Sequence, residues 1–203
     1  MTYKGIIGRK YEQHLITERC QSGKAELIAV YGRRRVGKTF LVRKMFDDKF
    51  AFSFTGMYEV SRLGQLEHFR NTLQQYSGKS IPRLKDWLEA FEALRQYVET
   101  ILLQEQIIIF LDELPWMDTP KSNFMAAFGA FWNTWASTQP NVKIFVCGSA
   151  TTWMLSHLIG DKGGLYGRVS RAIYLAPFSL SETEEIPNQF LSELPYITPL
   201  SFL

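Results

Sequence analysis

The sequence predicts an α/β domain with a mainly parallel sheet of five strands, and two observations support this fold class. Short apolar segments rich in β-branched residues alternate along the chain with segments of helical periodicity. The apolar segments are nearly continuous, which is typical of strands that are buried on both faces. Helices on both faces of such a sheet give three layers, so we expect an α/β/α arrangement.

Four of the five expected strands end near residues that stop or turn a strand. Gly32 follows the first strand, Asp112 follows the third, Gly148 follows the fourth, and Pro177 lies shortly after the fifth. The apolar pattern of a strand is weakest in the second expected strand, at residues 50–55. The strands are expected at residues 27–31, 50–55, 107–111, 142–147 and 172–175.

Helical periodicity fills the intervals between these strands. Helices are expected at residues 39–46, 63–76, 84–103 and 123–135. The last helix carries aromatic residues at helical spacing, which favours a face in the core over a stacking platform for nucleic acid. These residues are Phe124, Phe128, Phe131, Trp132 and Trp135.

The end of the chain changes in character. After a short helix expected at residues 181–186, Pro187, Pro195 and Pro199 prevent a long helix. We therefore expect a core domain over residues 1–181 and an irregular, proline-containing tail over residues 182–203.

Composition excludes several classes of protein. The chain has 203 residues, of which 46% are hydrophobic, so it can bury one sizeable core. A net charge of +3 indicates no particular partner. Cys20 and Cys147 lack metal-ligand spacing, and no apolar run approaches the roughly 20 residues of a membrane span. We expect a soluble cytoplasmic protein that does not bind membranes.

A phosphate-binding loop follows the first expected strand and opens the next helix. Its residues match the pattern G-x-x-x-x-G-K-[ST]. Backbone N–H groups in such a loop point at the phosphates, Lys38 would reach the β- and γ-phosphates, and the Thr39 hydroxyl would bind Mg²⁺. We assign contact with the nucleotide to Gly32, Arg33, Arg34, Arg35, Val36, Gly37, Lys38, Thr39 and Phe40. The three arginines either contact phosphate, a partner or nucleic acid, or are simply solvated.

An acidic pair follows the third expected strand. Asp112 would hold Mg²⁺, and Glu113 would polarise a water molecule for attack on the γ-phosphate. The interval between Thr39 and Asp112 is long enough for another strand, which indicates the class of P-loop NTPases with an additional strand and a catalytic glutamate. The guanine-binding pattern Asn-Lys-x-Asp does not occur in the sequence, which disfavours a GTPase.

Two further residues are candidates for catalysis. Ser149, directly after the fourth strand, would act as a sensor of the γ-phosphate or the attacking water, or would only make a turn and cap the next helix. Arg168 lies in the glycine-rich segment 163–168, and Arg171 follows it. Either arginine would stabilise charge on the phosphoryl group, in cis or from a neighbouring subunit, or would be an ordinary surface arginine.

The combination of motifs resembles the P-loop ATPase family described as an ATPase domain found predominantly in Archaea, which is related to AAA+ and STAND nucleotidases. The resemblance rests on Ile7-Gly8-Arg9, the loop with its preceding Tyr31, Leu111-Asp112-Glu113, Cys147-Gly148-Ser149, Leu165-Tyr166-Gly167-Arg168 and Leu175-Ala176-Pro177-Phe178-Ser179. It implies ATP binding and hydrolysis coupled to conformational change, with Gly8 and Arg9 near the adenine and ribose. Members of the family continue into a helical lid and a C-terminal region. Because this chain ends at Leu203, we expect both to be missing.

Two main functions therefore stay open, with a small-molecule kinase as a third option. The leading hypothesis is an ATPase that uses ATP and Mg²⁺, with Glu113, Lys38, Ser149 and Arg168 in catalysis. The alternative is a nucleotide-dependent module that binds nucleic acid or protein and hydrolyses little or no ATP. A DNA or protein partner bound through the missing C-terminal region, and assembly into a homo-oligomer, are further expectations.

Overall fold

Five parallel strands form one sheet in the computed structural model, which describes residues 5–160, 165 and 167–184. Their order across the sheet is β2-β3-β4-β1-β5, and every neighbouring pair is parallel. The strands are β1 (Glu26–Tyr31), β2 (Phe52–Thr55), β3 (Ile107–Asp112), β4 (Val142–Gly148) and β5 (Arg171–Tyr174). The predicted fold class is confirmed, and β4 separates β1 from β3, as expected for the class with an additional strand.

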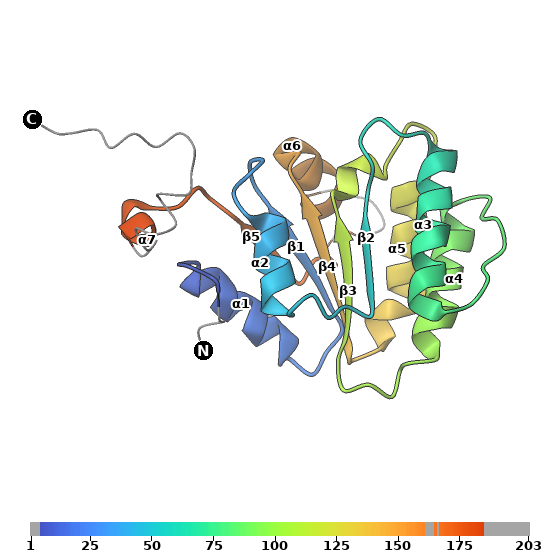
Figure 1. Ribbon diagram of the computed structural model, residues 1–203, viewed down its shortest axis with the longest axis horizontal. Helices are drawn as coiled ribbons and strands as arrows, with labels where there is room; N and C mark the ends of the chain where they lie inside the picture. The colour runs from blue at the N-terminus through green and yellow to red at the C-terminus, as the bar shows by residue number, and fades with distance from the viewer. Residues whose placement is uncertain (1–4, 161–164, 166, 185–203) are drawn as a thin grey trace, which may run out of the picture.

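Helices cover both faces of the sheet, as Figure 1 shows. One face carries α1 (Lys10–Cys20) and α2 (Lys38–Met45), and the other carries α3 (Arg62–Ser77), α4 (Trp87–Glu99) and α5 (Phe124–Thr134). Successive strand residues point to opposite faces, so Leu27 and Ala29 pack in one hydrophobic cluster while Ile28 and Val30 pack in the other. The expected three layers are confirmed.

The cluster beneath α3, α4 and α5 is rich in aromatic side chains. All five aromatic residues singled out in the segment 123–135 are buried, which confirms that they belong to the core. The Trp87 ring lies against Phe54, Phe69, Phe91 and Phe124, with ring centroids between 4.9 and 6.4 Å apart. This aromatic network fixes the helical layer on the sheet.

Two helices differ from the expectation. Helix α1 was not predicted, because apolar residues such as Leu15 and Ile16 are few among its polar ones. The helix expected at 84–103 is shorter, since the Asp86 side chain caps its first turn by accepting a hydrogen bond from the Glu89 N–H, and the chain leaves the helix after Glu99.

Short helical segments complete the described chain. They are the 3₁₀ turns η1 (Leu114–Trp116) and η2 (Ala136–Thr138), α6 (Thr151–Trp153), the π-helical η3 (Met154–Ile159) and α7 (Leu180–Glu184). The domain boundary expected at residue 181 falls within α7 and stays a prediction. Pro187, Pro195 and Pro199, and Gly163, Gly164 and Tyr166 of the glycine-rich segment, lie outside the described residues. Among the described helices, none combines the length and the apolar character needed to cross a membrane.

Replacing Trp87 with alanine should destabilise the domain by about 3–5 kcal/mol, because it leaves a cavity among aromatic rings that cannot all collapse into it. Leu88, the next residue on α4, is 58% exposed, so Leu88→Ala should change the free energy of unfolding by less than about 0.5 kcal/mol. Urea unfolding followed by far-UV circular dichroism measures both. Equal losses in the two variants would contradict this packing of Trp87.

Candidate nucleotide-binding site

The candidate site lies at the edge of the sheet where β1, β3 and β4 end. Because the strands are parallel, the residues that follow all three meet at this carboxyl edge. The structure brings together Lys38 and Thr39 from the start of α2, Asp112 and Glu113 from the end of β3, and Ser149 from the end of β4. All five residues were predicted from the sequence.

The loop between β1 and α2 is fixed by its backbone. Gly32 has φ 145°, and a Cβ atom there would lie 2.3 Å from the carbonyl oxygen of Leu175, so no other residue fits without a shift of the backbone. Gly37 has φ 89° and precedes the first residue of α2. The Lys38 side chain is 6% exposed, and its Nζ donates to the carbonyl oxygens of Gly32, at 3.0 Å, and Arg33, at 2.8 Å. The ammonium group therefore lies inside the curve of the loop.

A chain of hydrogen bonds connects the loop to the strand ends. The Thr39 hydroxyl donates to Asp112 Oδ2 at 2.9 Å, and the Glu113 N–H donates to Asp112 Oδ1 at 3.0 Å. Burial raises the pKa of the Asp112 carboxyl above its ordinary value, while the bond from Thr39 acts in the opposite direction. Thr39 and Asp112 thus place two hard oxygen donors side by side.

These oxygen donors suit Mg²⁺, which binds carboxylates, hydroxyls and phosphates. Among the described residues there is no group of three or more His, Cys, Asp or Glu that could hold a metal alone. A magnesium ion at Thr39 and Asp112 would therefore take its other oxygens from phosphate and water, as Mg²⁺ at nucleotide sites does.

Glu113 has a left-handed backbone with φ 49°, just before η1 begins. The Ser149 hydroxyl donates to its Oε2 at 3.1 Å. Ser149 therefore contacts the expected general base. Its carbonyl oxygen also accepts the Thr151 N–H in a turn, but its side chain does not cap α6, for which Ala150 is the cap residue.

A polar cleft of about 700 Å³ opens above the loop. Lys38, Thr39 and Glu113 line it, and Tyr58 and Trp116 form part of its wall. Neither aromatic residue was predicted from the sequence. Trp116 follows Glu113 by three residues, so its place near the site could have been inferred from the sequence. Nothing in the sequence pattern near Tyr58 indicated the site.

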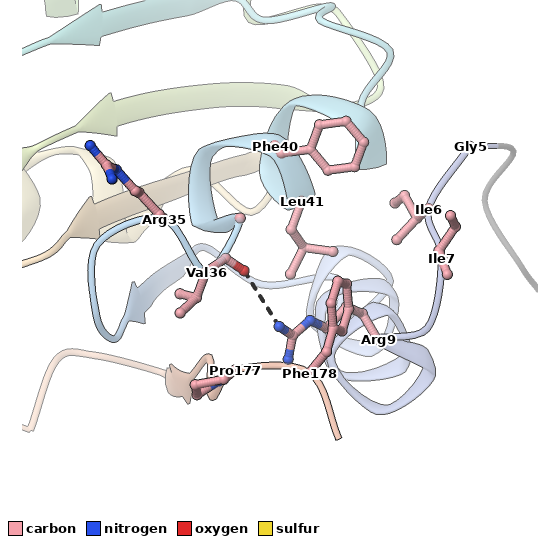
Figure 2. A pocket seen from close by; sticks show the side chains of 11 residues that line it. Gly5, Ile6, Ile7, Arg9, Arg35, Val36, Phe40, Leu41, Pro177 and Phe178 are labelled. Atoms are coloured by element: carbon pink, nitrogen blue, oxygen red, sulfur yellow. Dashed lines mark hydrogen bonds between the residues drawn. The ribbon is translucent and has the colours of Figure 1, made fainter. Parts of the chain in front are cut away.

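An apolar pocket of about 500 Å³ lies against the loop and the start of α2, where it shares Arg35, Gly37 and Phe40 with the polar cleft. Figure 2 shows its lining. The chain start and the segment after β5 both contribute to its lining, which includes Ile6, Ile7, Val36, Phe40, Leu41, Pro177 and Phe178. Of these, only Val36 and Phe40 were predicted from the sequence as contacts of the nucleotide. Among the described residues, none that lines the pocket carries a carboxylate.

Arg9 closes one end of this apolar pocket. Its guanidinium lies 4.2 Å from the centroid of the Phe178 ring and donates to the Val36 carbonyl oxygen at 3.4 Å, the contact drawn in Figure 2. Its backbone N–H donates to Glu182 Oε1 at 2.9 Å. Gly8, with φ 61°, lies behind the lining, where a Cβ atom would meet the Glu182 side chain at 3.0 Å.

Arg168 lies at the opposite end of the sheet, so its predicted role in cis is wrong. It is exposed and lines a cleft with Lys24 and Pro140, which precede β1 and β4. Residues ahead of a strand lie at the amino edge of a parallel sheet, whereas the loop lies at the carboxyl edge. A role for Arg168 toward a neighbouring subunit stays a prediction.

Two solved structures have a similar fold. The Walker-type ATPase PABY2304 of Pyrococcus abyssi superposes with a TM-score of 0.68 at 21% identity, over 96% of this chain and 60% of that one. A chain of the Drosophila ORC complex bound to AT-rich DNA and Cdc6 superposes with a TM-score of 0.53 at 14% identity, over 94% of this chain and 63% of that one.

Two curated proteins of Methanocaldococcus jannaschii are related in sequence. The uncharacterised protein MJECL04 is 26% identical over 191 residues, which are 93% of this chain and 40% of that protein. The uncharacterised ATP-binding protein MJ0423 is 44% identical over 44 residues, which are 22% of this chain and 75% of that protein. This chain thus spans less than half the length of the first relative. It belongs to the family of ATPase domains found predominantly in Archaea, whose model matches residues 7–200.

Proposed function

We propose that the chain binds ATP together with Mg²⁺ at the carboxyl edge of its sheet and hydrolyses ATP to ADP and inorganic phosphate. The observation that carries this proposal is the hydrogen-bonded chain Thr39–Asp112–Glu113–Ser149, which joins the phosphate-binding loop to the ends of β3 and β4. A site that only bound nucleotide would not need a carboxylate beside the metal-binding acid.

The nucleotide spans the apolar pocket and the polar cleft, which share Arg35, Gly37 and Phe40. Its adenine enters the apolar pocket against Phe40 and Leu41, with Arg9 at the end where the ribose would lie. The phosphates lie along the loop, where Lys38 turns from the Gly32 and Arg33 carbonyl oxygens to the β- and γ-phosphates. Mg²⁺ at Thr39 and Asp112 would neutralise phosphate charge.

Hydrolysis then proceeds from the polar cleft. A water oxygen attacks the γ-phosphorus while the bond to the β–γ bridging oxygen breaks, and Glu113 accepts a proton from the water. The products are ADP and inorganic phosphate, and the proton leaves Glu113 for phosphate or solvent. Ser149 orients the Glu113 carboxylate by the hydrogen bond that it donates.

Contacts at the apolar pocket support coupling of the nucleotide to conformation. Phe178 stacks on Arg9, and Glu182 accepts hydrogen bonds from the N–H groups of Arg9 and Ser179, both at 2.9 Å. Pro177 and Phe178 line the pocket, so a base bound there would contact the segment 177–184 and bias its position.

A second candidate function is nucleotide-dependent binding of DNA or a protein partner. The observation that favours it is the exposure of Arg33, Arg34 and Arg35 side by side on the loop. The structure of the Drosophila complex contains AT-rich DNA, but at 14% identity that complex is similar to this chain in fold alone.

Lys38→Ala should abolish stabilisation by ATP, because the loop loses the ammonium group that it buries. ATP with Mg²⁺ at 100 times Kd should stabilise the wild type by about 2.7 kcal/mol, which for a chain of this size raises Tm by about 5–10 °C. The matched control is Lys49→Ala, an exposed lysine after α2 that should keep the full shift. A thermal-shift titration measures all three proteins, and an equal shift in Lys38→Ala would overturn the assignment.

Glu113→Gln should keep ATP affinity within about threefold and lower the single-turnover hydrolysis rate by about 100-fold or more, the range expected for loss of a general base. Glu105→Gln changes an exposed carboxylate ahead of β3, at the opposite edge of the sheet, and should leave the rate unchanged. Rapid-quench measurement of ADP formation tests both variants. Wild-type turnover in Glu113→Gln would show that another group is the base.

If the chain also binds DNA, its affinity should rise with ATP and fall steeply with salt, since each phosphate contact releases counterions. Fluorescence anisotropy of a labelled duplex between about 50 and 200 mM salt, with and without ATP, measures this. An affinity that responds to neither salt nor ATP would count against the second candidate.

A further inference from the structure

We propose that Arg34 is an arginine finger supplied in cis by the phosphate-binding loop itself, and that its guanidinium contacts the γ-phosphoryl group in the transition state of hydrolysis. This inference rests on the proposed function. It assigns to this chain's own loop a role that was expected from the sequence for Arg168, which lies at the other edge of the sheet.

Arg34 has the right position for this contact. Its side chain is exposed and lines the polar cleft together with Lys38, Thr39 and Glu113. A cation there faces the oxygens of the γ-phosphoryl group, which gather charge as the bond to the bridging oxygen breaks. An arginine can donate two N–H groups to such oxygens at once.

The wall of the cleft shows where this guanidinium is held in the structure. Its Cζ lies 5.9 Å from the centroid of the Trp116 ring, and Tyr58 meets the same ring edge-on at 5.5 Å. A cation–π contact near the 6 Å limit on a partly exposed ring is weak. The guanidinium can therefore leave Trp116 for a phosphoryl oxygen, which forms a stronger, charge-assisted hydrogen bond.

A buried glutamine holds this aromatic wall in place. The Gln65 side chain is 0% exposed, and its Nε2 donates to the carbonyl oxygens of Trp116, at 3.0 Å, and Met57, at 2.6 Å. Its Oε1 accepts the Met57 N–H at 3.1 Å. One residue of α3 thus fixes the loop that carries Tyr58 to the turn that carries Trp116, so the surface under Arg34 is rigid.

The neighbouring arginines fit the role less well. Arg33 lines neither the polar cleft nor the apolar pocket, and its contribution to the site is its carbonyl oxygen, which accepts from Lys38. Arg35 has φ 65° and lines both hollows, and Figure 2 shows its side chain extending away from Arg9 and Phe178. Arg34 is the member of the run whose guanidinium rests on the turn that follows Glu113.

Arg34→Ala and the control Arg83→Ala test the proposal. Both remove an exposed arginine, and Arg83, in the segment between α3 and α4, lines neither the polar cleft nor the apolar pocket. Arg34→Ala should lower the single-turnover rate by about 100-fold or more, with ATP affinity changed by less than about fivefold, whereas Arg83→Ala should hydrolyse like the wild type. Arg34→Lys should recover little of the rate, because an ammonium group lacks the planar pair of donors. Equal rates in Arg34→Ala and Arg83→Ala, or the loss appearing in Arg33→Ala or Arg35→Ala instead, would overturn the proposal.

A binding measurement separates this inference from the proposed function. The wild type and Arg83→Ala should bind ADP with aluminium fluoride, a mimic of the transferring phosphoryl group, more tightly than ADP, and Arg34→Ala should lose that preference. If the wild type neither hydrolyses ATP nor shows the preference, the proposed function fails and the inference fails with it. If the wild type does both and Arg34→Ala keeps the preference, only the role of Arg34 is overturned.

A mixing experiment tests whether Arg34 acts within its own chain. Lys38→Ala retains Arg34 but should not bind ATP, and Arg34→Ala should bind ATP without the finger. In cis action, a mixture of the two variants hydrolyses no faster than Arg34→Ala alone at the same concentration. Recovery of the rate in the mixture would show that the arginine acts on a neighbouring chain and would overturn the assignment in cis.

Discussion

All five strands of the sheet run in the same direction, and the rest of the site depends on this constraint. Parallel strands send their carboxyl ends to one edge, so residues as distant in sequence as Thr39, Asp112 and Ser149 come within a continuous chain of hydrogen bonds. The insertion of β4 between β1 and β3 adds Ser149 to this edge. With β3 directly beside β1, the Glu113 carboxylate would lack the hydroxyl that orients it.

The parallel arrangement also determines which residues can be buried. Both faces of each central strand need a helical cover, and the chain meets this need with two separate hydrophobic clusters. The aromatic network around Trp87 fixes α3, and α3 in turn carries Gln65 to the loops that hold Tyr58 and Trp116. Packing deep in the core and the shape of the polar cleft are thus parts of one connected structure.

The sequence was sufficient for residues whose role follows from their neighbours in the chain. The loop, Asp112 and Glu113 were predicted because a strand end and a helix start fix their local geometry. Tyr58, Trp116 and Phe178 were not, because they reach the site through contacts between distant segments, which periodicity does not report. The position of Arg168 also follows from the sequence pattern. Arg168 lies just ahead of β5, and a residue ahead of a parallel strand lies at the amino edge of the sheet, away from the loop.

Glu113 combines two features that position its carboxylate. Its left-handed backbone, with φ 49°, is an uncommon conformation for a residue with a side chain, and its N–H and carboxylate are both engaged, by Asp112 and by Ser149. Such backbone conformations persist when the surroundings impose them, and they gather at functional sites. Here the turn aims the carboxylate into the polar cleft and at the same time starts η1, which carries Trp116 beneath Arg34. One strained residue therefore sets the positions of both the proposed base and the proposed finger, so a change in its backbone would disturb the two together.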